Sequence, residues 1–146
     1  MSDLIQRYRT FLATFALAVT VLVLFFPASG HEFINRYDTD YILRNPFVYQ
    51  GMTWEGVGWA FTAMDLSNWH PLTWLSHMLD VTFFGMDAGG HHLVNILIHT
   101  LNTVLLFVAL FRMTRAFWRC VFVAALFGLH PLHVESVAWV AERKDV

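Results

Sequence analysis

Two short segments of this 146-residue sequence concentrate the side chains that can exchange protons. The first contains Asp38 and Asp40, which are separated by a single threonine. Two carboxylates at this spacing can act as acid and base or share a metal ion. An Asp-Thr-Asp turn whose side chains cap backbone groups is the simpler use of the same residues. The spacing alone therefore leaves both interpretations open.

The second segment, at the end of the sequence, combines imidazoles, carboxylates and cations. An HxxH pattern on a helix places both imidazoles on one face and suits a metal ion, but Pro131 lies between them and no spacing fixes a third ligand. Histidines hydrogen-bonded at a helix end are the simpler interpretation. The basic pair is suited to receiving a phosphate. The residues concerned are His130, His133, Glu135, Arg143, Lys144 and Asp145.

A third set of polar side chains forms a stripe within an apolar stretch. His92, Asn95, His99 and Asn102 repeat at helical spacing, so in a membrane they must face protein or water instead of lipid. Hydrogen bonding between helices is the expected role. A haem held by two histidines is an alternative, but it needs a histidine in the middle of another apolar stretch, and neither of the others has one.

The elements that position these residues are apolar stretches of membrane-spanning character. The sequence is 57% hydrophobic and 14% charged, against about 45–50% and about 25% in soluble domains. About 20 apolar residues span a bilayer. We expect spans at about 10–29, 89–111 and 116–134, the last being short unless its polar end lies near the interface. The fold class is therefore an all-α integral membrane protein.

Arginines orient these spans. Arg7 and Arg9 precede the first span, and Arg112, Arg115 and Arg119 follow the second. Cytoplasmic ends are enriched in Lys and Arg, so we expect a cytoplasmic amino terminus and cytoplasmic loop at about 112–116. The loop at about 30–88 and the tail 135–146 are then outside. An alternative for the first span is a cleavable signal peptide.

The predicted outer loop contains two amphipathic segments. Thr53 is placed to cap a helix that starts at Trp54, and residues 71–84 have an apolar stripe with Thr73, His77 and Asp80 on the opposite face. Such helices lie flat at the interface or pack on a bundle.

Several function classes are excluded by what the sequence lacks. It has no Gly-rich phosphate loop and no Gly-x-Ser-x-Gly elbow. Its net charge of -2 provides no basic field for nucleic acid. The single Cys120 cannot form an internal disulfide and is interpreted as a small buried hydrophobe.

Three long runs carry a resemblance to a known family. NWHPLTWLSHMLDVTFFG, GGHHLVNILIHTLNTVLLF and ALFGLHPLHVESVAWVAERKDV resemble the amino-terminal membrane region of bacterial membrane proteins with tetratricopeptide repeats. Those proteins are similar to the transmembrane and TPR-containing O-mannosyltransferases of the GT-C superfamily. The resemblance extends from about Phe33 to Val146.

The resemblance implies a glycosyltransferase that acts on the non-cytoplasmic side. It implies transfer of a mannose-like sugar from a polyprenyl phosphate to a protein hydroxyl. It places a catalytic acid after the first span, here Asp38 with Asp40 nearby. It also places Glu135 in a second outer motif, as a further catalytic residue that would help to position the acceptor or the donor. His70 and the residues of the second segment are then expected near the substrates. A divalent cation is allowed but not required.

The family has more spans and a repeat domain, so we expect the 146 residues to be part of a GT-C bundle, inactive alone. A non-catalytic membrane anchor for a repeat domain is the first alternative, and a haem or metal module is the second. If the source is bacterial, the expected location is the inner membrane.

Overall fold

The computed structural model describes residues 2–34, 37–64 and 69–146, so positions 35–36 and 65–68 of the predicted outer loop lie outside the described residues. All regular structure in the described part is helical, which confirms the all-α prediction. The elements in chain order are α1 (Ser2–Phe25), the 3-10 helix η1 (Phe26–Gly30), the π-helical turn η2 (Thr39–Leu43), α2 (Pro46–Tyr49), α3 (Trp54–Thr62), α4 (Pro71–Phe84), α5 (Ala88–Thr114), α6 (Phe117–Leu129), α7 (His133–Ala138) and the 3-10 helix η4 (Val140–Asp145).

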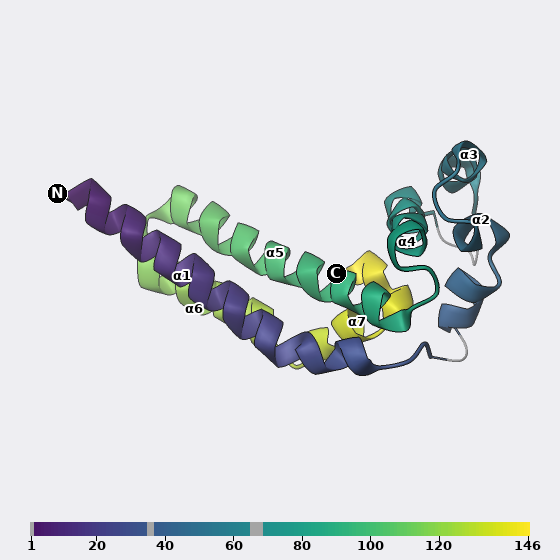
Figure 1. Cartoon of the computed structure of the whole chain (residues 1–146). Coiled ribbons are helices and arrows are strands. Elements are labelled where there is room, and N and C mark those ends of the chain that lie inside the picture. Colours follow the sequence, from purple (N-terminus) through teal and green to yellow (C-terminus); the bar gives the residue numbers. More distant parts are fainter. Residues whose placement is uncertain (1, 35–36, 65–68) are drawn as a thin grey trace.

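Helices α1, α5 and α6 run side by side as an elongated bundle (Figure 1). Two segments are long and apolar enough to cross a membrane: Leu4–Gly30, which joins α1 to η1, and Ala88–Thr114, which is α5. Helix α6 is apolar but has 13 residues. It ends at Leu129 because the next residue precedes Pro131, and a residue before proline disfavours the helical conformation. The chain becomes helical again at α7, within the predicted third span.

The bundle packs closely inside and is apolar outside. A Cβ on Gly128 of α6 would lie 2.8 Å from Thr103 Cγ2 on α5 and 2.9 Å from Val21 Cγ2 on α1. The outward faces expose large apolar side chains, as expected for a surface in contact with lipid and not for one in water. These side chains include Phe11, Phe15, Val23, Leu97, Leu101, Leu105, Phe122 and Leu126.

At the opposite end of the bundle from the amino terminus, α2, α3 and α4 form a separate group (Figure 1). Its core combines Tyr41 and Ile42 of η2 with Trp74 of α4 and with Val140 and Ala141 of η4. The chain that follows the first membrane helix therefore packs against the carboxyl-terminal segment.

Local signals set the ends of the helices in this group. Thr53 Oγ1 accepts a hydrogen bond of 3.0 Å from Gly56 N, which confirms the predicted cap of α3. Helix α4 has proline at its first position and ends at Gly85, whose φ of 62° is in the left-handed region.

Helix α4 buries polar and apolar side chains together. His77 and Asp80 of its polar face are buried with Trp74 and Met78 of the predicted apolar stripe, whereas Leu72 of that stripe is 75% exposed. Burial of ionisable side chains requires partners, and these partners define the site.

Candidate functional site

Arg143 lies at the centre of a buried polar network at the end of the bundle that bears α4. Arg143 belongs to η4, and the residue is 5% exposed. Nη1 lies 2.5 Å from Asp80 Oδ2, and Nε donates to Asn95 Oδ1 at 2.6 Å. Nη2 donates to the carbonyl oxygen of His91 at 2.9 Å, and Nη1 also donates to Ser76 Oγ at 3.2 Å. One side chain therefore joins α4, α5 and η4.

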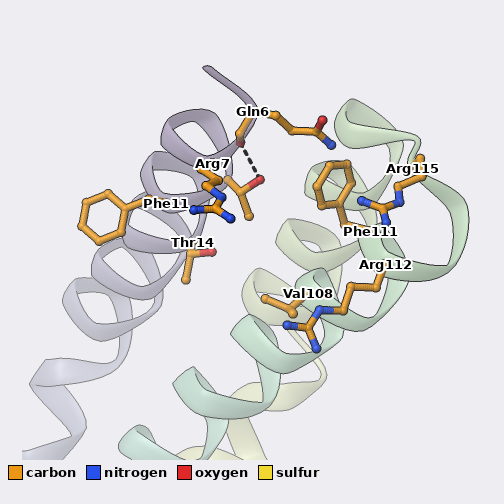
Figure 2. Close-up of a pocket in the computed structure, with 9 residues that line it drawn as sticks. Gln6, Arg7, Phe11, Thr14, Val108, Phe111, Arg112 and Arg115 are labelled. Atoms are coloured by element: carbon orange, nitrogen blue, oxygen red, sulfur yellow. Dashed lines mark hydrogen bonds between the residues drawn. The ribbon is translucent and has the colours of Figure 1, made fainter. Parts of the chain in front are cut away.

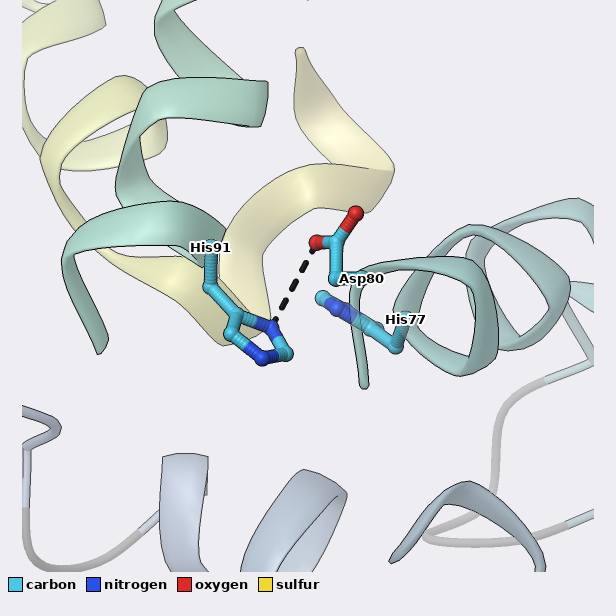
Figure 3. Close-up of side chains that lie close together, drawn as sticks. All are labelled: His77, Asp80 and His91. Atoms are coloured by element: carbon cyan, nitrogen blue, oxygen red, sulfur yellow. Dashed lines mark ion pairs between the residues drawn. The ribbon is translucent and has the colours of Figure 1, made fainter. Parts of the chain in front are cut away.

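Two imidazoles flank the Asp80 carboxylate (Figure 3). His91 Nδ1 lies 3.4 Å from Asp80 Oδ2, while His91 Nε2 lies 3.1 Å from the Gly85 carbonyl oxygen. His77 is fully buried, and neither of its ring nitrogens has a hydrogen-bond partner within the described part of the chain. Burial, reinforced by the nearby Arg143, lowers the pKa of His77 well below its usual value, so this imidazole is neutral.

The Asp80 carboxyl of this network titrates closer to neutral pH than an ordinary aspartate does. Burial raises its pKa from 3.8 to about 6, although the charge and the hydrogen bond of Arg143 both oppose the shift. Burial also lowers the pKa of Arg143, against the effect of Asp80. Burial therefore makes the charged form of both the carboxyl and the guanidinium less favourable than it is in solution.

His77, Asp80 and His91 also satisfy the distances of a metal site, since one ligand atom from each lies within 4.8 Å of the others. Imidazole nitrogen and carboxylate oxygen are the usual zinc ligands. However, Arg143 Nη1 already contacts Asp80 Oδ2, and a divalent cation on that oxygen would be repelled by the guanidinium. The cluster is therefore better described as a buried ion pair between two imidazoles.

Asp38 forms a second connection between distant segments. Its Oδ2 accepts a hydrogen bond of 2.8 Å from Ile34 N, and its Oδ1 accepts one of 2.9 Å from Ala141 N. The side chain is fully buried. Burial raises the pKa of the carboxyl, and the two backbone N–H groups partly offset that increase because they favour the charged form.

The other two predicted catalytic acids are in different surroundings. Asp40 is exposed and lies 3.6 Å from Arg44 Nη1, one turn further along the chain. Glu135 is exposed on α7. The structure therefore distinguishes Asp38 from Asp40, which the sequence pattern alone did not.

The predicted substrate-binding histidines are spread over the same end of the molecule. His70 precedes α4 and stacks on Trp74, with ring centroids 4.8 Å apart. His130 follows α6, and its Nδ1 accepts a hydrogen bond from Leu132 N at 3.2 Å. His133 begins α7 and packs on Phe127, with centroids 4.7 Å apart.

The remaining predicted substrate-binding residues belong to η4. Arg143 is committed to protein partners, as described above. Lys144 Nζ lies 2.8 Å from Glu142 Oε2, and both Lys144 and Asp145 are exposed. The basic pair is therefore split into one buried and one accessible cation.

The polar stripe on α5 faces protein, as expected. Asn95 Nδ2 donates to the Trp139 carbonyl oxygen at 3.1 Å, and His99 Nε2 lies 3.1 Å from the Gly128 carbonyl oxygen. Asn102 Nδ2 donates to the Val146 carbonyl oxygen, and His92 is buried. The stripe holds α6, α7 and η4 against α5.

Sequence reasoning did not select His77, Asp80 and His91 as site residues. The polar face of residues 71–84 was visible, but the segment was expected either to lie flat at the interface or to pack on a bundle, and no partner for the polar face was predicted. The sequence did contain a signal for this site, which was the excess of polar side chains on two apolar helices. If neither polar face is exposed to lipid, the two polar faces must face each other.

The described residues define an all-α membrane protein with two helices of spanning length and a buried polar network at one end of the bundle. The chain is similar to the protein O-mannosyl-transferases of the TMTC type, which confirms the resemblance to TPR-containing O-mannosyltransferases. It is 33% identical over 132 residues, 85% of its length, to protein O-mannosyl-transferase Tmtc2 of Drosophila melanogaster. It is 32% identical over 127 residues, 79% of its length, to TMTC1 of Mus musculus.

A shorter region, 54% of the chain, is 38% identical over 82 residues to protein O-mannosyl-transferase tmtc2 of Xenopus laevis. The chain spans 9%, 13% and 14% of the lengths of the Xenopus, mouse and fly relatives respectively. No protein-family profile matches the chain. No solved structure matches it either.

Proposed function

We propose that this chain supplies part of the catalytic end of a membrane O-mannosyltransferase. The enzyme would move a mannose-like sugar from a polyprenyl-phosphate donor to a serine or threonine hydroxyl of a protein, on the non-cytoplasmic side. Similarity to proteins named as O-mannosyl-transferases supports the reaction class. The observation that carries the proposal is the buried Asp38 carboxylate, which follows the first membrane helix and contacts η4.

In this proposal Asp38 is the general base. A serine or threonine hydroxyl is a weak nucleophile, so a carboxylate must accept its proton as the oxygen attacks. The new bond joins this oxygen to the anomeric carbon, the bond from that carbon to the phosphate oxygen breaks, and the lipid phosphate leaves with the electron pair. A raised pKa makes the Asp38 carboxylate a stronger base than an aspartate of ordinary pKa.

The leaving phosphate needs a cation or a hydrogen-bond donor nearby. Lys144 is the accessible cation of η4. His130 directly follows α6, and His133 is the first residue of α7. We assign these three to the donor phosphate. Arg143 is assigned a positioning role, because its hydrogen bonds hold η4 and not a ligand.

A polar cavity of about 480 Å³ at the same end is our candidate for the sugar subsite. It lies between η1 and the first turn of α5, where a Cβ on Gly89 would come within 2.8 Å of the Ser29 carbonyl oxygen. His31, Glu32 and Asp87 line it and offer hydrogen-bond acceptors for sugar hydroxyls. A glycine at position 89 therefore allows the close approach that forms one wall.

The proposal is tested by comparing Asp38→Asn with Asp40→Asn in the longest natural form of the protein. Loss of a general base lowers the rate on the order of 100-fold or more. We expect this loss in sugar transfer for Asp38→Asn and near-normal transfer for Asp40→Asn. The amide oxygen of asparagine can still accept one backbone hydrogen bond, and a thermal melt in detergent verifies that folding is retained.

Normal transfer by Asp38→Asn would remove the catalytic role of Asp38. Absence of transfer by the unaltered protein would instead favour the alternative, a non-catalytic membrane anchor. That alternative draws support from the same structure, since both Asp38 oxygens already accept backbone hydrogen bonds. It predicts that changes at Asp38 and at Glu135 are tolerated alike wherever the fold is retained.

A further inference from the structure

The end of the bundle opposite the buried network carries a basic pocket that the proposed transferase does not use. The pocket has a volume of about 580 Å³ and lies between the first turns of α1 and the last turns of α5 (Figure 2). Gln6, Arg7, Thr10, Phe11, Thr14, Val108, Phe111, Arg112 and Arg115 line it.

Three guanidinium groups, from Arg7, Arg112 and Arg115, surround this pocket. All three side chains are exposed, and no lining residue is acidic. Among the side chains that the structure describes, which begin at Leu4, no carboxylate forms an ion pair with any of the three. Arg9 differs, because its guanidinium carbon lies over the Phe117 ring, 4.6 Å from the centroid. The pocket thus concentrates positive charge that the described side chains leave uncompensated.

The position of Arg115 adds a backbone observation. It follows the last residue of α5 and has a φ of 57°, in the left-handed region that glycine or asparagine usually occupies at a helix end. Glycine would fit this backbone better, and the side chain that the chain carries there instead lines the pocket.

The interior of the pocket is apolar. Val108 and Phe111 form its α5 wall, and the exposed Phe11 forms part of its α1 wall. Thr14 lies two helical turns beyond Arg7, so the pocket extends about 10 Å along the bundle toward the membrane interior. A phosphate would meet the arginines at the open end, and a hydrocarbon chain would meet the apolar walls.

We propose that this pocket binds an anionic phospholipid, with the phosphate between Arg7, Arg112 and Arg115 and an acyl chain along Phe11 and Val108. Basic pockets between membrane helices are suited to anionic headgroups. The site holds α1 and α5 together at the end where a loop joins α5 to α6. This proposal is independent of the proposed transferase function, since none of its residues belongs to the buried network.

The test measures lipid binding to the purified full chain in detergent by native mass spectrometry. The probes are phosphatidylglycerol, phosphatidylcholine and inorganic phosphate. Each arginine near an anionic lipid contributes roughly fivefold to binding. We therefore expect Arg7→Gln with Arg112→Gln to weaken phosphatidylglycerol binding on the order of 25-fold. Phosphatidylcholine should bind weakly to all forms.

The matched control is Arg9→Gln with Arg119→Gln. It removes the same charge at the same end of the bundle and replaces no residue that lines the pocket, although Arg9 borders a neighbouring cavity. Equal losses in the two double variants would overturn the proposal, because they would show a diffuse basic surface and no pocket.

Two further variants distinguish a lipid from a free phosphate and binding from folding. Val108→Phe fills the apolar part while retaining every charge, so it should weaken phosphatidylglycerol binding but would leave a free phosphate site intact. Arg115→Gly removes the backbone strain of the positive φ together with one guanidinium. Lipid binding should therefore fall without any loss of thermal stability. Unchanged binding in Val108→Phe, or displacement of phosphatidylglycerol by millimolar inorganic phosphate, would overturn the lipid assignment.

Discussion

The Asp80–Arg143 pair is a connection that the rest of its network depends on. Both side chains are at most 5% exposed, and their contact joins α4 to η4. Removal of one partner from a buried ion pair typically destabilises a protein by about 3–5 kcal/mol, because the remaining charge is left without compensation. The remaining Arg143 hydrogen bonds to Asn95 and to the His91 carbonyl oxygen extend the connection to α5.

We predict that the Asp80 carboxyl of the folded protein titrates near neutral pH. Its pKa in the folded protein is about 6, above the ordinary value of 3.8. The folded protein therefore binds the proton more tightly than the unfolded chain, and this group's contribution to stability increases as the pH falls from about 6 toward 3.8. Carbon-13 NMR of labelled aspartate carboxyls should show a transition near pH 6 that is absent in Asp80→Asn.

The charge and hydrogen bond of Arg143 lower the pKa of Asp80, so Arg143→Gln should move this transition to higher pH. A downward shift in that variant, or a wild-type transition at the ordinary value, would contradict the assigned environment.

Sequence reasoning identified Asp38 and Arg143 but not what they contact. Asp38 could be selected because it follows an apolar span, which is a local feature. Its bond to Ala141 N joins segments 103 residues apart, and no spacing rule predicts such a contact. Asp80 was hidden for the same reason, since its partner lies on η4.

Among the elements, those with strong local signals were predicted well. Helix α4 has proline at its start and glycine at its end, and α3 has a threonine cap. These residues act on the backbone directly, so the sequence is sufficient. The direction in which the faces of α4 point was not predicted, because it depends on the polar partners supplied by α5 and η4.

The packing of α6 on α1 and α5 leads to a second prediction. Because a Cβ on Gly128 would approach Thr103 and Val21 within 3 Å, Gly128→Ala must push the helices apart. Overpacking of this kind costs typically about 1–3 kcal/mol. Unfolding of the purified protein in mixed detergent should detect that loss.

Gly58→Ala is the matched control for this change. Position 58 is also inside a helix, but nothing lies within 4 Å of the added methyl group. Alanine is favoured over glycine in a helix by up to about 1 kcal/mol, so this variant should be as stable as the wild type or more stable. Equal changes in stability at the two positions would show that helix propensity determines the effect and that packing between helices does not.

For the molecule as a whole, the two ends of the bundle differ in chemistry. The start of α1 and the turn between α5 and α6 lie at one end, and the buried network lies at the other (Figure 1). The arginines that precede the first span and those that follow the second therefore meet at the same end. This geometry is what the predicted orientation requires, although it does not by itself say which end faces the cytoplasm.

Our last prediction is that the arginine end is cytoplasmic, since cytoplasmic ends are enriched in arginine and lysine. In a Cys120→Ala background, Trp54→Cys and Met113→Cys place single thiols at positions that are 92% and 80% exposed, one at each end. An impermeant maleimide on intact cells should label Trp54→Cys alone, and permeabilised cells should show both. The background without added cysteine controls for non-specific labelling. Labelling of Met113→Cys alone in intact cells would reverse the orientation and place Asp38 and the buried network on the cytoplasmic side, where the proposed transfer could not take place.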